Sequence, residues 1–202
     1  MTAPPEHKRA LAHATVDVPR AGPGQTADEA RAMLFRPEPF ESVDDIAVLE
    51  GDRLLGLVRI EGLIVDDSHS MRAVIKKTVS MSGVPVGEFH EAANGKEALA
   101  VLAGTWIDVI LSDINMPEMG GMELLKKVSE DEELRKIPLI FITTESSDAR
   151  MEEARKLGVA GYVKKPFQPE TIKAILYEVL EKAYAHRLEE KPNEEIGEES
   201  DF

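Results

Sequence analysis

The chain has 202 residues, 43% of them hydrophobic, and a formal net charge of −14. It contains no cysteine, which excludes disulfide bonds and thiolate metal sites. Acidic residues outnumber basic ones in every part of the chain, by 10 to 7 over 1–60, 21 to 15 over 61–184 and 7 to 2 over 185–202. Direct DNA binding is therefore not expected, because affinity for nucleic acid depends on Lys and Arg that neutralise phosphates.

Residues 1–60 are expected to be an extension that is mostly disordered. Six of the twelve prolines fall within the first 40 residues, where apolar periodicity is weak, so we expect this part to be disordered. The exception is one short helix expected at 27–35. Two apolar runs separated by a Gly-containing turn predict a hairpin at 45–58. Residues 43–63, which contain this strand, turn and strand, resemble half of a CBS repeat. A helix would follow in such a repeat, but residues 60–65 are predicted to form a strand instead.

From residue 61 onward, apolar strands alternate five times with amphipathic helices. Such alternation predicts an α/β domain over 61–184, a doubly wound five-stranded parallel sheet with flavodoxin-like strand order. Beyond Ala185 the chain is acidic and contains Pro192 and Gly197, so 185–202 are expected to be a disordered tail. Strands are expected at 63–65, about 88–92, 109–111, 139–142 and 161–163, and helices near 68–80, 98–102, 121–128, 148–157 and from Pro169 onward.

Four of these strands end in polar or charged residues. Asp66 and Asp67 follow the first strand, Asp113 follows the third, Thr143 ends the fourth and Lys165 follows the fifth. The carboxyl ends of parallel strands meet at the edge where open α/β sheets bind ligands. Carboxylates held close together repel unless a cation lies among them, and an oxygen ligand set suits Mg²⁺, while a nearby lysine can neutralise a phosphoryl group. The sequence therefore predicts a Mg²⁺-dependent site in which an aspartate handles phosphate.

The motifs at these strand ends resemble those of the receiver domains of two-component response regulators. They lie at 65–68, 112–117, 137–143 and 161–167, and their order, spacing and strand-end placement agree with that family. The resemblance covers residues 62 to about 184 and is closest in form to the single-domain chemotaxis response regulators. It implies a receiver domain over 61–184 that is complete without the first sixty residues.

By this resemblance, Asp113 is the phosphoacceptor. Mg²⁺ would be held by Asp67, Asp113 and the backbone carbonyl of Asn115, with Asp66 acting through water. Asp66 and Asp67 could instead serve only to cap the helix that follows them. One carboxylate is enough for that task, so the metal role is preferred.

Three further residues take roles from the same resemblance. Thr143 is the switch hydroxyl, and Lys165 is the ammonium that contacts the phosphoryl group. The bond between Lys165 and Pro166 is the position at which the family has a cis peptide. Tyr162 is the aromatic residue whose rotamer reports phosphorylation to partners.

Asn115 and Glu145 are the positions expected to tune dephosphorylation. They follow Asp113 and Thr143 by two residues and flank the path of water to the phosphoryl group. The chemotaxis regulators carry the same pair and lose their phosphate quickly, so fast self-dephosphorylation is expected. Thr144 stands where the family commonly has a small residue, and its bulk narrows the same entrance.

The resemblance also implies a function and its partners. A receiver takes its phosphoryl group from a sensor histidine kinase, and here the output would be phosphorylation-dependent binding to a protein such as the flagellar motor switch. A phosphorelay shuttle that passes the group to a phosphotransfer protein is the alternative. No enzymatic activity is expected beyond phosphorylation and dephosphorylation of its own aspartate. No apolar run approaches the ~20 residues that cross a bilayer and no secretory signal is present, so we expect a cytoplasmic protein.

A phosphatase of the haloacid dehalogenase type is the rival interpretation, since it also uses a strand-end aspartate with Mg²⁺. Such an enzyme needs a second aspartate two residues further on as its general acid, and Asn115 occupies that position. A third possibility is an interaction domain that is never phosphorylated. It is disfavoured because every residue of the site is present.

Overall fold

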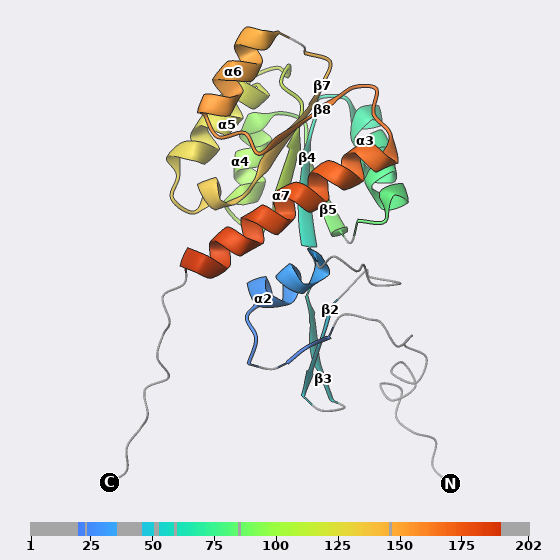
Figure 1. The fold of residues 1–202 in the computed structure, drawn as a ribbon. Coiled ribbons are helices and arrows are strands. Elements are labelled where there is room, and N and C mark those ends of the chain that lie inside the picture. The colour runs from blue at the N-terminus through green and yellow to red at the C-terminus, as the bar shows by residue number, and fades with distance from the viewer. Residues whose placement is uncertain are drawn as a thin grey trace.

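The computed structural model describes residues 20–22, 24–35, 46–50, 53–58, 60–84, 86–145 and 147–190. These residues form two sheets, a five-stranded sheet with the order β5-β4-β6-β7-β8 and a three-stranded sheet with the order β1-β2-β3. Figure 1 shows the smaller sheet beneath the larger one, at the amino end of β4.

Every strand pair in the five-stranded sheet is parallel. Both β6 and β7 are buried along their whole length, as expected of central strands that helices cover on both faces. The first strand of this sheet lies between the second and the third, which confirms the predicted flavodoxin-like, doubly wound fold. The strands are β4 (Ile60–Val65), β5 (Val86–Ala92), β6 (Val109–Ser112), β7 (Leu139–Thr143) and β8 (Gly161–Lys164).

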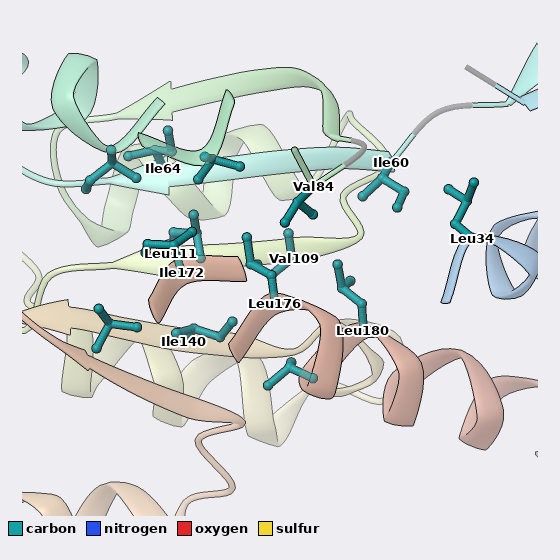
Figure 2. Packing of buried hydrophobic residues seen from close by; sticks show 14 of the residues in the cluster. Leu34, Ile60, Ile64, Val84, Val109, Leu111, Ile140, Ile172, Leu176 and Leu180 are labelled. Carbon is teal, nitrogen blue, oxygen red and sulfur yellow. The ribbon is translucent and has the colours of Figure 1, made fainter. Parts of the chain in front are cut away.

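Helices cover both faces of this sheet, with α3 and α7 on one face and α4, α5 and α6 on the other. Figure 2 shows Ile172, Leu176 and Leu180 of α7 packed against the strand residues Val109 and Ile140. The helices are α3 (His69–Ser82), α4 (Gly95–Leu102), α5 (Gly121–Glu130), α6 (Asp148–Lys156) and α7 (Pro169–Glu190), and the short 3-10 helix η2 (Leu134–Lys136) precedes β7.

Polar residues cap the helices that follow β4 and β5. The Ser68 hydroxyl accepts the backbone N–H of Met71 at 3.3 Å, and the Asn94 side chain accepts two backbone N–H groups of α4 at 3.0 Å. The cap of α3 is therefore Ser68 and not the acidic pair Asp66 and Asp67. Both carboxylates of that pair are left for other contacts.

The predicted hairpin at 45–58 is present. Strand β2 (Ile46–Glu50) pairs antiparallel with β3 (Arg53–Val58), and the two-residue strand β1 (Arg20–Ala21) adds to β2 in parallel. The residues after β3 form strand β4, and not the helix that a CBS repeat would place there, which confirms the preference for a strand.

The predicted short helix is also present, and it packs on the receiver fold. It consists of α2 (Ala27–Ala32), which begins with a capping box, and the 3-10 helix η1 (Met33–Phe35). Ala30 and Leu34 are buried in the same core cluster as Leu180, and Figure 2 shows Leu34 beyond the end of β4 on the side of α7. The helix was expected from the sequence, but its packing against α7 was not, because that apolar partner lies far away along the chain. The rest of 1–60 lies outside the described residues.

Helix α7 extends further than the sequence predicted. It continues to Glu190, into the range 185–202 that was expected to be a tail. Tyr184 is one of the largest fully buried side chains, and α7 contacts both α2 and η1. The remainder of the predicted tail lies outside the described residues. Among the helices in the described part of the chain, none is long and apolar enough to cross a membrane.

Candidate functional site

The parallel sheet brings together the four strand ends that the sequence singled out. Strands β4, β6, β7 and β8 are consecutive neighbours, so the residues that end or follow them lie at one edge. Asp66 follows β4, Asp113 follows β6, Thr143 ends β7 and Lys165 follows β8. In an open α/β sheet this carboxyl edge is the place where ligands bind.

Lys165 lies between two of the aspartates. Its ammonium nitrogen Nζ is 2.7 Å from Oδ2 of Asp66 and 3.2 Å from Oδ2 of Asp113. The Asp66 side chain is 2% exposed and that of Asp113 is 15% exposed, so Asp66 is buried while Asp113 is partly exposed to solvent. Lys164 is exposed and makes no such contact with either aspartate, as expected for the alternate residue of a strand.

Fixed donors hold the other oxygens of the two aspartates. Oδ1 of Asp66 accepts the backbone N–H of Ser68 at 2.9 Å, and Oδ1 of Asp113 accepts the backbone N–H of Ile114 at 2.7 Å. Both Asp66 oxygens are thus engaged within the protein. Asp67 is exposed, and its carboxylate makes no hydrogen bond or ion pair recorded among the described residues.

The donor set fits Mg²⁺ by its chemistry. Asp66, Asp67 and Asp113 carry three negative charges against the single positive charge of Lys165, and all their donor atoms are oxygens. Within the described residues, no three His, Asp or Glu side chains are grouped as a metal cage. Mg²⁺ commonly takes one or two carboxylates and completes its shell with water and phosphate, so oxygen donors of this kind fit it. Asp67, which is exposed and makes no contact recorded among the described residues, and the partly exposed Asp113 are the carboxylates that would hold it, whereas Asp66 is buried.

Thr143 and Tyr162 reach the same region from adjacent strands. The Thr143 side chain is fully buried, and its hydroxyl accepts the backbone N–H of Glu145 at 3.2 Å. The Tyr162 hydroxyl donates to the backbone carbonyl of Glu145. Burial, followed by the carboxylates of Glu145 and Asp113, raises the pKa of the Tyr162 phenol, so it stays protonated and able to donate.

The segment after Asp113 turns sharply into α5. A Cβ atom on Gly121 would lie 2.1 Å from the carbonyl oxygen of Asp113, so only glycine fits at this close approach. A Cβ on Gly120, the N-cap residue of α5, would lie 2.8 Å from the carbonyl oxygen of Ile114. A side chain at this N-cap would require the turn to shift, and with glycine there α5 has no side-chain cap hydrogen bond. The peptide bond between Lys165 and Pro166 is cis, as the family resemblance implied.

Asn115 and Glu145 are joined by a residue that the sequence analysis missed. The Nη1 atom of Arg150, in the first turn of α6, is 2.9 Å from Oδ1 of Asn115 and 2.9 Å from Oε2 of Glu145. Asn115 and Arg150 are 35 residues apart, so no local spacing signals their contact. The separation of five between Glu145 and Arg150 gave no helical signal either, because Glu145 precedes the helix.

Comparisons with known proteins agree with this fold. A family model described as the response regulator receiver domain matches residues 63–177. Chemotaxis protein CheY1 of Helicobacter pylori is 44% identical over 119 residues, which cover 58% of this chain and 94% of that protein. Chemotaxis protein CheY-3 of Vibrio cholerae is 38% identical over 120 residues, which cover 59% of this chain and 91% of that protein.

Solved structures give the same result. The chemotaxis response regulator CheY4 of Vibrio cholerae is similar with a TM-score of 0.54 at 38% identity, over 60% of this chain and 98% of that one. A CheY-like response regulator receiver domain protein of Methanospirillum hungatei has a TM-score of 0.57 at 26% identity, over 63% and 98%. The family match begins inside β4, so α2 and the β2–β3 hairpin lie outside it.

Proposed function

Because the chain belongs to the family of response regulator receiver domains, we propose that it accepts a phosphoryl group from a histidine kinase on Asp113. The observation that carries this proposal is the position of the Lys165 ammonium, which contacts both Asp66 and Asp113. A lysine held there can neutralise a phosphoryl oxygen on Asp113 without leaving Asp66.

The transfer step uses groups that are already in place. A carboxylate oxygen of Asp113 attacks the phosphorus of a phosphohistidine, a P–O bond forms, the P–N bond breaks, and the electron pair returns to the imidazole. The backbone N–H of Ile114 holds one Asp113 oxygen and Lys165 the other, so the nucleophile is oriented before the donor arrives. Mg²⁺, when bound by Asp67 and Asp113, supplies further neutralisation of the phosphoryl oxygens.

After transfer, the new phosphoryl group offers acceptors to Lys165 and to the Thr143 hydroxyl. Thr143 accepts from the backbone of Glu145, whose carbonyl in turn accepts from Tyr162. Movement of Thr143 toward the phosphoryl group would therefore change the support of Tyr162 and bias the surface made by α6, β8 and α7 between two states. The output is phosphorylation-dependent binding of another protein by that surface.

The named relatives support chemotaxis as the pathway, since those compared above are chemotaxis proteins. The flagellar motor switch is accordingly the proposed target, and the exchange with the kinase takes place in the cytoplasm. A phosphorelay shuttle, in which Asp113 passes its phosphoryl group to a phosphotransfer histidine, remains the second candidate. The protein then acts as a switch and not as an enzyme with an external substrate.

A phosphatase of the haloacid dehalogenase type fits the site less well. The position of its general acid is taken by Asn115, whose carboxamide oxygen accepts from Arg150. An amide in that contact has no acidic proton to give to a leaving group, so catalytic turnover of phosphate esters is not expected.

The proposal is tested by labelling the protein with a phosphorylated histidine kinase or with acetyl phosphate in the presence of Mg²⁺. We expect one acid-stable, base-labile phosphoryl group per chain, located at Asp113, and none in Asp113→Asn because an amide is not a competent nucleophile. Stable labelling of Asp113→Asn would contradict the site. Many turnovers of a phosphate monoester by the parent protein would contradict the assignment as a switch.

A further inference from the structure

The guanidinium of Arg150 connects two segments that approach Asp113 from different strands. Asn115 lies in the segment after β6, two residues beyond Asp113, and Glu145 lies in the segment after β7, two residues beyond Thr143. One atom, Nη1 of Arg150, donates to both side chains at 2.9 Å. We call these three residues the Arg150 bridge.

The Arg150 bridge also connects to the switch residues. Besides its side-chain contact with Arg150, Glu145 donates its backbone N–H to Thr143 and accepts from Tyr162 through its carbonyl. Glu145 is therefore fixed through three separate groups. The Glu145 side chain is 21% exposed and the Arg150 side chain is 47% exposed, so the bridge lies at the surface.

We propose that Arg150 is a positioning residue that sets the lifetime of the phosphoryl group by holding Asn115 and Glu145 together across the approach of water. This inference rests on the proposed phosphorylation of Asp113. In hydrolysis, a water oxygen attacks the phosphorus opposite the Asp113 oxygen. The bond between phosphorus and that oxygen then breaks, the carboxylate leaves with the electron pair, and a proton goes to solvent. The Arg150 guanidinium engages the two side chains that would otherwise hydrogen-bond the water.

This reverses the expectation that follows from Asn115 and Glu145 alone. Those two side chains leave space for water and predict fast loss of phosphate. Arg150 places a cation between them from a third element, α6, so we expect the parent protein to lose its phosphoryl group more slowly than the pair by itself would indicate.

The test is the first-order decay of phosphorylated protein after the kinase or acetyl phosphate has been removed. In Arg150→Ala we expect decay to be about two- to fivefold faster, the range that fits the loss of an exposed ion pair. The matched control is Arg155→Ala, on the same helix, which removes an exposed arginine whose recorded ion pair among the described residues is with Glu152 at 3.4 Å. The control should decay at the parental rate, and both variants should keep a cooperative melt because alanine favours helix.

Two further measurements separate the bridge from a general structural effect. Arg150→Lys should restore most of the parental lifetime, because an ammonium can also donate to both oxygens. Glu145→Ala should change the decay rate more when it is made in the parent protein than when it is made in Arg150→Ala. In the Arg150→Ala background the contact between Glu145 and Arg150 is already lost. Added salt should speed the decay of the parent and leave Arg150→Ala nearly unchanged, because exposed ion pairs are screened.

The outcomes are distinguishable. If neither the parent nor the variants can be labelled on Asp113, the proposed function fails and this inference fails with it. If all are labelled, but Arg150→Ala decays at the parental rate or more slowly, only the inference on Arg150 is overturned. Additive effects of the Arg150 and Glu145 substitutions would overturn it as well.

Discussion

Acidic residues lie at both ends of strand β6, but they differ in burial and in the number of groups that compensate their charge. At the amino end, Asp108 precedes β6 and is completely buried. Its carboxylate accepts the backbone N–H of Glu61 and the indole N–H of Trp106, both at 2.9 Å, and lies 3.4 Å from the guanidinium of Arg31. At the carboxyl end, Asp113 follows β6, is partly exposed and shares one ammonium with a second aspartate.

The difference shows what separates a structural carboxylate from a reactive one. Donors from three separate segments satisfy Asp108, and its complete burial leaves no surface for a ligand. Asp113 has one fixed N–H donor and a lysine divided between two acids, so its charge is only partly compensated. Incomplete compensation together with exposure allows a cation and a phosphoryl group to bind.

Loss of the Asp108 carboxylate should have the largest effect on stability. In Asp108→Ala, Arg31 loses its nearer acidic partner and keeps only the longer contact to Asp28 among the printed ion pairs of the described residues, and two N–H donors lose an acceptor, so we expect the free energy of unfolding to fall by about 3 kcal/mol. Asp113→Ala should lower it by less than about 1 kcal/mol, because Lys165 keeps the closer Asp66 as its partner. Urea denaturation of both variants measures the difference, and equal losses would remove the distinction between the two ends.

Truncation of Leu34 tests whether the N-terminal segment belongs to the amino end. Leu34 is 3% exposed and shares a core cluster with Leu180, so Leu34→Ala should cost about 2–3 kcal/mol of unfolding free energy. Val74→Ala is the control, since Val74 on α3 is 50% exposed and should change stability by no more than about 0.5 kcal/mol. If Leu34→Ala left the free energy of unfolding unchanged, the first sixty residues would be dispensable for folding.

Asp67→Ala should have the smallest effect on stability and a clear one on Mg²⁺. Since Asp67 makes no contact recorded among the described residues, we expect the urea midpoint to be unchanged. The dissociation constant for Mg²⁺ should rise roughly tenfold or more, as for the loss of groups that hold a metal. Isothermal titration calorimetry measures this dissociation constant, and an unchanged value would show that Asp67 is not a ligand of the ion.

The receiver fold was predictable because its signals are local. Each strand is a short apolar run that ends in a polar residue, and the positions of Asp66, Asp113, Thr143 and Lys165 follow from the parallel sheet. Arg150 and Arg31 were not predictable in this way. Each acts on a partner in a distant segment, Asn115 in one case and Asp108 in the other, and both contacts exist only once the fold has placed the helices.

The end of α7 was missed for a similar reason. Composition beyond Ala185 is that of a solvated tail, yet the helix continues to Glu190. Its buried Tyr184 lies in the same cluster as Leu34, so an apolar surface from the start of the chain packs on the last part of α7. Hydrophobic periodicity within one segment does not reveal a partner from another.

The position of Trp106 gives the protein a built-in optical reporter. It is the single tryptophan of the chain, its indole N–H donates to Asp108, and the guanidinium of Arg31 lies 5.6 Å from the centre of its ring. Strand β6 separates it from Asp113 by roughly 15–20 Å at the usual rise per residue. Its fluorescence should therefore record whether α2 is docked. Because Trp106 lies far from Asp113, we expect its emission to be insensitive to Mg²⁺ bound there. A change in emission on phosphorylation would thus be direct evidence that the state of one edge of the sheet reaches the other.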